Sequence, residues 1–275
     1  MLILPMERTF NIRRPPVVTF LLLIINVVVF MTTNDNDNEL LLAAVEAYDE
    51  RQLLDSELPL FEAYLKSQSN GAEVWGDLES IEDPDSPQRF YLIAQVLTDR
   101  EYALYLERNS DWFTFEQLDT LTEKQSIIET YIDQLVYLRF GFIPAEFSVL
   151  TMFSSQFLHG DIFHLIGNMV ILVLVGLTVE QLLGSFNFLL FYLLSGAVAS
   201  ATYGLVHLGS PVTLIGASGA ISGLMGMYVA AYGKRPIRFF YWIGVYFNYV
   251  KLPALVMLPI WVGKEVFDFL FTDSN

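Results

Sequence analysis

Hydrophobic residues occur in long runs that are separated by one extended polar stretch. The first run covers residues 17–31, and apolar residues dominate again from residue 150 onward. Runs of this length with few charges are typical of helices that cross a lipid bilayer. The pattern predicts membrane helices at residues 17–32, 161–182, 187–207, 217–232 and 252–271, with the aromatic stretch 239–250 lying along the membrane interface.

The polar stretch, residues 33–138, has a different pattern. Apolar residues recur there at helical spacing, as in Leu41, Ala44, Val45 and Tyr48. Thr120 and Glu123 have the spacing of a capping box at a helix start. The stretch therefore predicts a soluble insert of three or four helices, and the whole chain an all-α membrane bundle.

The acidic residues are concentrated in the polar stretch and not in the apolar parts of the chain. The formal net charge is −16, but residues 33–138 carry 24 acidic and 6 basic residues, a net of −18, and the rest carries 7 and 9. An acidic segment of this kind excludes nucleic acid as a partner, because such proteins present a basic face. The chain has no cysteine, which excludes disulfides and thiolate chemistry. No metal site and no cofactor are predicted.

The distribution of basic residues predicts the topology. Arginines precede the first apolar run, and no small-residue cleavage pattern follows it, which favours a retained helix over a signal peptide. Basic residues stay on the cytoplasmic side of membrane helices. We therefore expect a cytoplasmic tail (1–16), a first membrane helix (17–32), an acidic helical insert on the outer side (33–138) and a membrane core (139–275).

Three polar residues fall within predicted membrane helices, where such groups are costly and mark candidate functional sites. His164 and Asn168 are four residues apart and so lie on one helix face. Two such donors can stabilise a developing oxyanion. They can also hold two membrane helices together by hydrogen bonds. Spacing alone favours this packing interpretation.

The third polar residue, Ser218, lies in a glycine-rich run. Gly216, Gly219, Gly223 and Gly226 fall on one face of a helix, which allows close packing between membrane helices. Ser218 lies at the start of the run, where a helix N-terminus presents free N–H groups and partial positive charge. This setting suits a serine nucleophile.

The order of these motifs is specific. The segment from Ser155 to Asn168, followed by Gly216-Ala-Ser218-Gly219, resembles the rhomboid family of intramembrane serine proteases, as do Arg139 to Glu146 and Glu180 to Gly184. The resemblance implies a bundle of six membrane helices and a transmembrane protein as substrate. Ser218 would be the nucleophile, His164 and Asn168 would form the oxyanion hole with the Ser218 N–H, and His159 would be an accessory residue at its mouth.

One departure divides the functional hypotheses. The family's base is a histidine on the sixth helix, after the serine, whereas the last histidine here is His207. We expect a C-terminally incomplete rhomboid protease with about five of six spans. The alternative is a catalytically inactive rhomboid-like binder of membrane helices. A transporter or channel is disfavoured, because the second to fourth spans lack paired acidic residues. The expected location is a bacterial inner membrane, and the partner of the insert is unknown.

Overall fold

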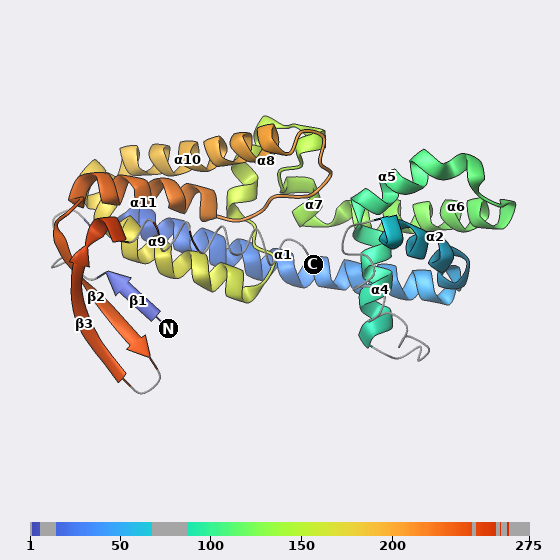
Figure 1. Cartoon of the computed structure of the whole chain (residues 1–275), viewed down its shortest axis with the longest axis horizontal. Coiled ribbons are helices and arrows are strands. Elements are labelled where there is room, and N and C mark those ends of the chain that lie inside the picture. Colours follow the sequence, from blue (N-terminus) through green and yellow to red (C-terminus); the bar gives the residue numbers. More distant parts are fainter. Residues whose placement is uncertain are drawn as a thin grey trace. The chain divides into compact units, whose positions relative to one another are not determined.

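The structure is a computed structural model that describes residues 2–5, 15–67, 87–243 and 246–256, with positions 259 and 263 (Figure 1). Its contacts divide the chain into two compact units. The bundle unit comprises Met1–Met31, Ser148–Val206 and Leu214–Asn275. The insert unit comprises Thr32–Phe147 and His207–Thr213.

Helices dominate the bundle unit and confirm the predicted helical membrane bundle. They are the first part of α1 (Val17–Glu50), then α8 (Val149–Ser154), the 3-10 helix η4 (Ser155–Phe157), α9 (Ile162–Leu183), α10 (Ser185–Val206) and α11 (Ser218–Tyr232). Among the described residues, α1, α9 and α10 are long and apolar enough to cross a membrane. Helix α11 has only 15 residues, and it packs against both α9 and α10. Buried aliphatic and aromatic side chains from all four helices form one core.

A buried carboxylate on α9 holds the start of α1 against this core. Glu180 of α9 accepts hydrogen bonds from the backbone N–H of Val18 (2.9 Å) and Thr19 (2.7 Å), and from the Thr19 hydroxyl (2.8 Å). The hydroxyl of Ser185, at the start of α10, donates to the same carboxylate at 2.6 Å. A negative charge is favourable at a helix N-terminus, where the first N–H groups lack partners within the helix. Glu180 therefore joins the starts of α1 and α10 to the end of α9.

A small antiparallel sheet accompanies the helices and was missed in the sequence. It has the order β1-β2-β3, with β1 at Leu2–Pro5, β2 at Pro236–Ile243 and β3 at Tyr246–Pro253. The stretch predicted to lie along the interface thus forms a hairpin, because aromatic and β-branched residues favour strands. The predicted span 252–271 is wrong at its start, since residues 252–253 end β3 and Ala254–Val256 form the 3-10 helix η5. The remainder of that span lies outside the described residues, apart from positions 259 and 263.

The insert unit is helical, as expected. After the second part of α1 come α2 (Leu53–Ser67), α4 (Pro87–Thr98), α5 (Arg100–Asn109), the 3-10 helix η1 (Ser110–Trp112), α6 (Phe115–Thr130), the 3-10 helix η2 (Ile132–Gln134), α7 (Val136–Phe140) and the 3-10 helix η3 (Pro144–Glu146). The capping box begins at Thr114 and ends at Gln117, which corrects the prediction at Thr120. Thr120 is instead a buried residue within α6.

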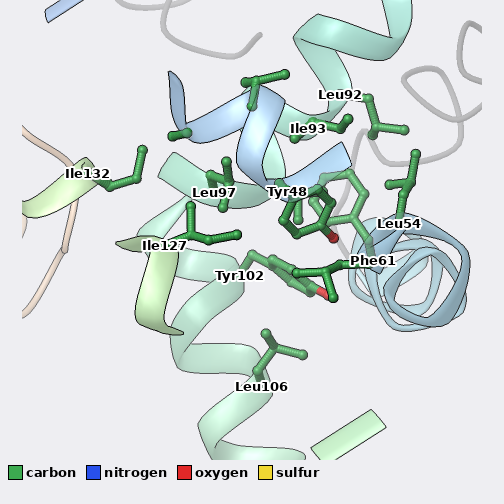
Figure 2. Packing of buried hydrophobic residues seen from close by; sticks show 14 of the residues in the cluster. Tyr48, Leu54, Phe61, Leu92, Ile93, Leu97, Tyr102, Leu106, Ile127 and Ile132 are labelled. Carbon is green, nitrogen blue, oxygen red and sulfur yellow. The ribbon is translucent and has the colours of Figure 1, made fainter. Parts of the chain in front are cut away.

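The core of the insert unit is rich in tyrosine. Figure 2 shows Tyr48, Phe61 and Tyr102 packed among aliphatic side chains from several helices. The rings of Phe61 and Tyr102 meet edge to face, with centroids 4.9 Å apart. Buried aromatic pairs of this geometry stabilise a core beyond the area that they bury. The insert therefore has a hydrophobic core of its own despite its negative charge.

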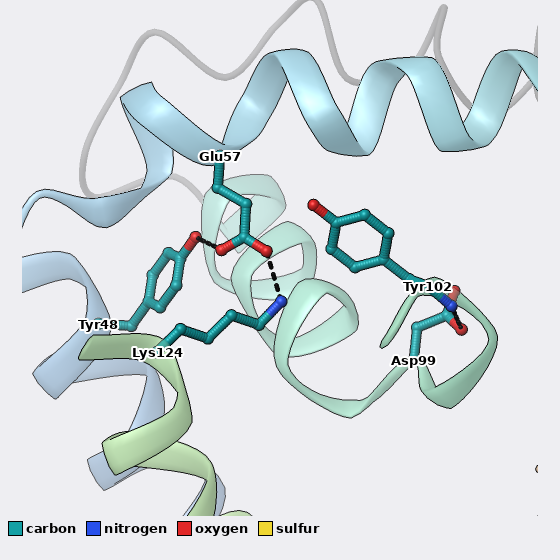
Figure 3. Close-up of polar contacts among 5 residues, drawn as sticks. All are labelled: Tyr48, Glu57, Asp99, Tyr102 and Lys124. Atoms are coloured by element: carbon teal, nitrogen blue, oxygen red, sulfur yellow. Dashed lines mark hydrogen bonds and ion pairs between the residues drawn. The ribbon is translucent and has the colours of Figure 1, made fainter. Parts of the chain in front are cut away.

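A buried ion pair lies within this core. Glu57 of α2 pairs with Lys124 of α6 and accepts a hydrogen bond from the Tyr48 hydroxyl at 2.6 Å (Figure 3). The Lys124 ammonium also lies 4.6 Å from the centre of the Tyr102 ring. Desolvation lowers the pKa of Lys124 below its ordinary value, and it raises the pKa of Tyr48 together with the nearby Glu57 charge. The arrangement connects four helices of the insert at one point.

The end of the insert is held to its beginning by Asp37. This α1 carboxylate accepts hydrogen bonds from the backbone N–H of Val136 (2.8 Å) and Tyr137 (3.2 Å), at the start of α7. Burial and the Asp37 charge raise the pKa of the Tyr137 phenol from 10.0 to about 12. Tyr137 thus remains neutral in the folded protein at a pH at which the unfolded chain ionises.

This pKa difference predicts alkaline instability of the insert. Between about pH 10.5 and 12 the unfolded state loses the Tyr137 proton and the folded state keeps it, so stability falls as the pH rises. Lys124 acts with the opposite sign, but only below its ordinary pKa of 10.5. Denaturant unfolding of the full chain in detergent should show the loss, and Tyr137→Phe should make it smaller. An equal loss of stability in Tyr137→Phe and in the original protein over this pH range would contradict this expectation.

Candidate active site

The residues before α9 place His164 and Asn168 on one helix face. Asp161 is the N-cap of α9, and its carboxylate accepts hydrogen bonds from the N–H groups of Phe163 (2.7 Å) and His164 (2.9 Å). His164 therefore lies in the first turn of α9, and Asn168 follows one turn later. Asn168 is buried, and its Nδ2 has no hydrogen-bond partner among the described residues. A buried donor without a partner is costly, which marks it as a candidate for binding a further group.

Both side chains converge on Gly216. A Cβ atom built on this glycine would lie 2.8 Å from His164 Nε2 and 3.8 Å from Asn168 Nδ2. The backbone of Gly216 also has φ +122°, a conformation that favours glycine. The structure thus brings the two polar side chains to one point on the main chain, two residues before Ser218.

Ser218 is the first residue of α11. Ala217 occupies the N-cap position and provides no side-chain hydrogen bond to the first turn. The first N–H groups of α11 therefore remain available to stabilise negative charge beside Ser218. The turn before the serine is fixed from the other side by the Gly216 N–H, which donates to the Ser155 carbonyl at 2.8 Å.

The glycines of the run play different parts. A Cβ atom on Gly219 would lie 2.5 Å from Ala199 Cβ, and one on Gly223 would lie 2.3 Å from Ser195 Oγ. These two glycines therefore allow α11 to approach α10 closely. Gly216 precedes the helix and faces α9, so the four glycines do not form one helical stripe. A Cβ atom on Gly226 would have no described atom within 4 Å, so close packing does not require glycine there.

The other two histidines differ in their surroundings. His159 is buried, and its ring contacts that of His164 edge to face, with centroids 5.1 Å apart. This position is compatible with an accessory role beside the site. His207 directly follows α10 and belongs to the insert unit. Among the described residues, no group of three or more His, Asp or Glu residues could hold a metal ion.

The sequence interpretation missed two residues that shape the site. Asp161 could have been found, because an aspartate just before an apolar helical run is a typical N-cap. Gln156 carried no such signal, since its contact with the Leu193 carbonyl joins residues that are distant in sequence. Both lie in the segment from Ser155 to Asn168 that carries the resemblance.

Comparisons with known proteins agree with the fold and the motifs. Residues 146–271 match the Rhomboid domain family. A relative from Arabidopsis thaliana, RHOMBOID-like protein 1, is 30% identical over 95 residues, which are 34% of this chain and 24% of the relative. The chain thus spans about a quarter of that relative's length. No solved structure matches the chain.

The matched domain contains the whole candidate site, from Ser155 through His164 and Asn168 to Ser218. It also contains two of the three helices that are long and apolar enough to cross a membrane, α9 and α10. The domain and these helices make the protein an integral membrane protein. Residues 146–271 of the chain therefore form a domain of the rhomboid family.

Proposed function

We propose that this protein is an intramembrane serine endopeptidase that cleaves transmembrane segments of other membrane proteins, with Ser218 as its nucleophile. The observation that carries the proposal is the convergence of His164 and Asn168 beside Gly216, two residues before the serine. Acyl transfer needs a nucleophile and donors for the oxyanion that forms when a carbonyl is attacked. These groups come from α9 and α11, which pack against each other.

Each residue has a proposed role. The Ser218 hydroxyl attacks the scissile carbonyl and forms a tetrahedral intermediate. The Asn168 amide, which has no partner among the described residues, donates to its oxyanion together with His164 and the Ser218 N–H. The Ser218 proton must pass to a base for the hydroxyl to be nucleophilic. In the family that base is a histidine after the serine, and this sequence has no histidine after Ser218.

The alternative function is that of a rhomboid-like protein that binds membrane helices without cutting them. Such a protein would keep the polar contacts of the site as packing contacts between helices. The two functions differ in whether the Ser218 hydroxyl reacts. In both, the N-terminus is cytoplasmic and the insert lies outside, and we propose a bacterial inner membrane as the location.

Labelling with a fluorophosphonate probe distinguishes the two functions, because these probes react only with activated serines. For a protease we expect one adduct per chain in detergent, located at Ser218 by mass spectrometry and absent in Ser218→Ala. Ser222→Ala provides the control, because Ser222 lies one turn away and donates to the Ser218 carbonyl at 2.8 Å. Absence of an adduct, with retained binding of a transmembrane peptide, would support the binder instead.

The oxyanion role of Asn168 makes a separate prediction. Asn168→Ala should lower kcat for a membrane-spanning substrate by about 10- to 1000-fold, because one oxyanion donor is lost. Asn187→Ala is a matched control, since Asn187 on α10 is exposed and donates only to the Leu183 carbonyl among the described residues. An unchanged kcat with a lower melting temperature would assign Asn168 to packing.

A further inference from the structure

Gln156 is a buried amide side chain that connects two helices. It lies in η4 and is only 2% exposed. Its Nε2 donates to the Met152 carbonyl of α8 at 3.0 Å and to the Leu193 carbonyl of α10 at 3.2 Å. The carbonyl of Leu193 is in the middle of α10, so this bond fixes η4 against the side of that helix. Burying an amide is costly unless it is hydrogen-bonded, and here both donor hydrogens are used.

The space for Gln156 is provided by Gly196. A Cβ atom on this glycine would lie 2.2 Å from Gln156 Cδ, so no other residue at position 196 leaves room for the amide. Gly196 in turn lies beside Gly219, whose built Cβ atom would be 3.9 Å from the Gly196 Cα. Gln156 is therefore packed where α10 approaches the first turn of α11, next to Ser218.

The residue before Gln156 holds the turn that leads to the nucleophile. The carbonyl of Ser155 accepts the Gly216 N–H at 2.8 Å. Gly216 has φ +122° and contacts His164. Within two consecutive residues, η4 thus binds α10 through a side chain and the turn before Ser218 through the main chain.

The side-chain oxygen of Gln156 argues against a purely structural role for this residue. Its Oε1 is buried and has no hydrogen-bond partner among the described residues. A methionine would fill a similar volume without leaving a buried acceptor unpaired, which is destabilising. A residue that served only to fill space would carry no such cost.

We infer that Gln156 is a positioning residue for the nucleophile: by fixing η4 to α10 it sets the Ser155–Gly216 hydrogen bond, and thereby the turn that presents Ser218 to His164 and Asn168. This inference rests on the proposed function for its catalytic meaning. The position of Ser218 can nevertheless be measured without cleavage.

The chain has no cysteine, so the reactivity of a single introduced thiol can be measured. Ser218→Cys introduces a single thiol, and its alkylation rate by iodoacetamide reports how the helix N-terminus favours the thiolate. In this background, Gln156→Met should slow alkylation about 3- to 10-fold, because the thiol at position 218 is then less well placed beside the first N–H groups of α11. In the protein with Ser218 intact, Gln156→Met should lower kcat for a membrane-spanning substrate and leave KM unchanged.

A paired substitution separates positioning from stability. Gly196→Ala alone should destabilise the bundle, because its methyl group overlaps the amide. In Gln156→Ala/Gly196→Ala the methyl group occupies part of the space that the shortened side chain vacates, so the melting temperature should recover. Alkylation at position 218 should remain slow in this pair, because the connection to the Leu193 carbonyl is still missing.

Leu172→Ala is the matched control for loss of stability, because Leu172 is fully buried in α9 and makes no polar connection. It should lower the melting temperature and leave the alkylation rate unchanged. The inference is overturned if the Gln156 variants alkylate at the original rate, or if Leu172→Ala slows alkylation equally. Failure of the proposed protease function is seen separately, as an absent fluorophosphonate adduct in the protein with Ser218 and Gln156 intact.

Discussion

Replacing Ser218 with alanine should reduce cleavage of a membrane-spanning substrate to background. The reason is chemical, because alanine has no group that can form the acyl-enzyme. The fold should persist, since Ser218 lies at the start of α11 and alanine is favourable in a helix. The measurement is cleavage of a labelled transmembrane substrate by the full chain in liposomes, with melting temperature measured in parallel.

Ser222→Ala serves as the control in this assay as well. It removes a hydroxyl from the same helix, one turn away, that donates to the Ser218 carbonyl at 2.8 Å. Its kcat should stay within a few-fold of the original. If Ser218→Ala retained full cleavage, the serine could not be the nucleophile and the proposed function would be withdrawn.

The second large effect concerns the insert. Glu57→Ala should destabilise it by about 3–5 kcal/mol, because the Lys124 charge would be left buried without its partner. The Tyr48 hydroxyl would lose its acceptor at the same time. Hydrogen exchange measured by mass spectrometry should show α2 and α6 exchanging more than 100-fold faster, since each 1.4 kcal/mol corresponds to about tenfold.

The control removes all three polar groups together. Tyr48→Phe/Glu57→Leu/Lys124→Met replaces the pair and its hydroxyl by apolar groups of similar size, and replacement of a buried ion pair in this way is often neutral. Protection of α2 and α6 should therefore return to near its original level. Unchanged exchange in Glu57→Ala would mean that the pair contributes nothing to holding these helices together.

The membrane helices could be predicted from the sequence because hydropathy reports burial in lipid directly. The expected ranges 161–182, 187–207 and 217–232 agree with α9, α10 and α11 within about two residues. Their ends carry local signals, such as the Asp161 cap and the positive φ of Gly184 and Gly233. Hydropathy predicts a membrane helix that ends at residue 32, but it does not predict where α1 itself ends. It continues to Glu50, because polar residues mark departure from lipid and do not interrupt a helix.

Other errors have equally specific causes. Thr114 and Thr120 each have a suitable partner three residues later, and spacing cannot choose between two caps on one amphipathic stretch. The hairpin of β2 and β3 was missed because an apolar aromatic run fits a strand or a membrane segment equally well.

The candidate site was predictable only in part. The spacing of His164 and Asn168 gives their common face, because it is a property of one helix. Gly216 approaches both side chains from a segment that is distant in sequence. The hydrogen bond from Gln156 to the Leu193 carbonyl likewise joins distant segments. No local pattern records such pairs.

The carboxylate of Glu180 also has a consequence for biosynthesis. Its partner Thr19 precedes it by 161 residues, so the ribosome must translate the entire acidic insert before this contact can form. At about 5–20 residues per second, the first helix waits roughly 8–30 s in the bilayer with its leading amides without that acceptor. During this interval a membrane chaperone or the insertion machinery could hold the nascent helix, and docking would follow only when the segment carrying Glu180 enters the membrane.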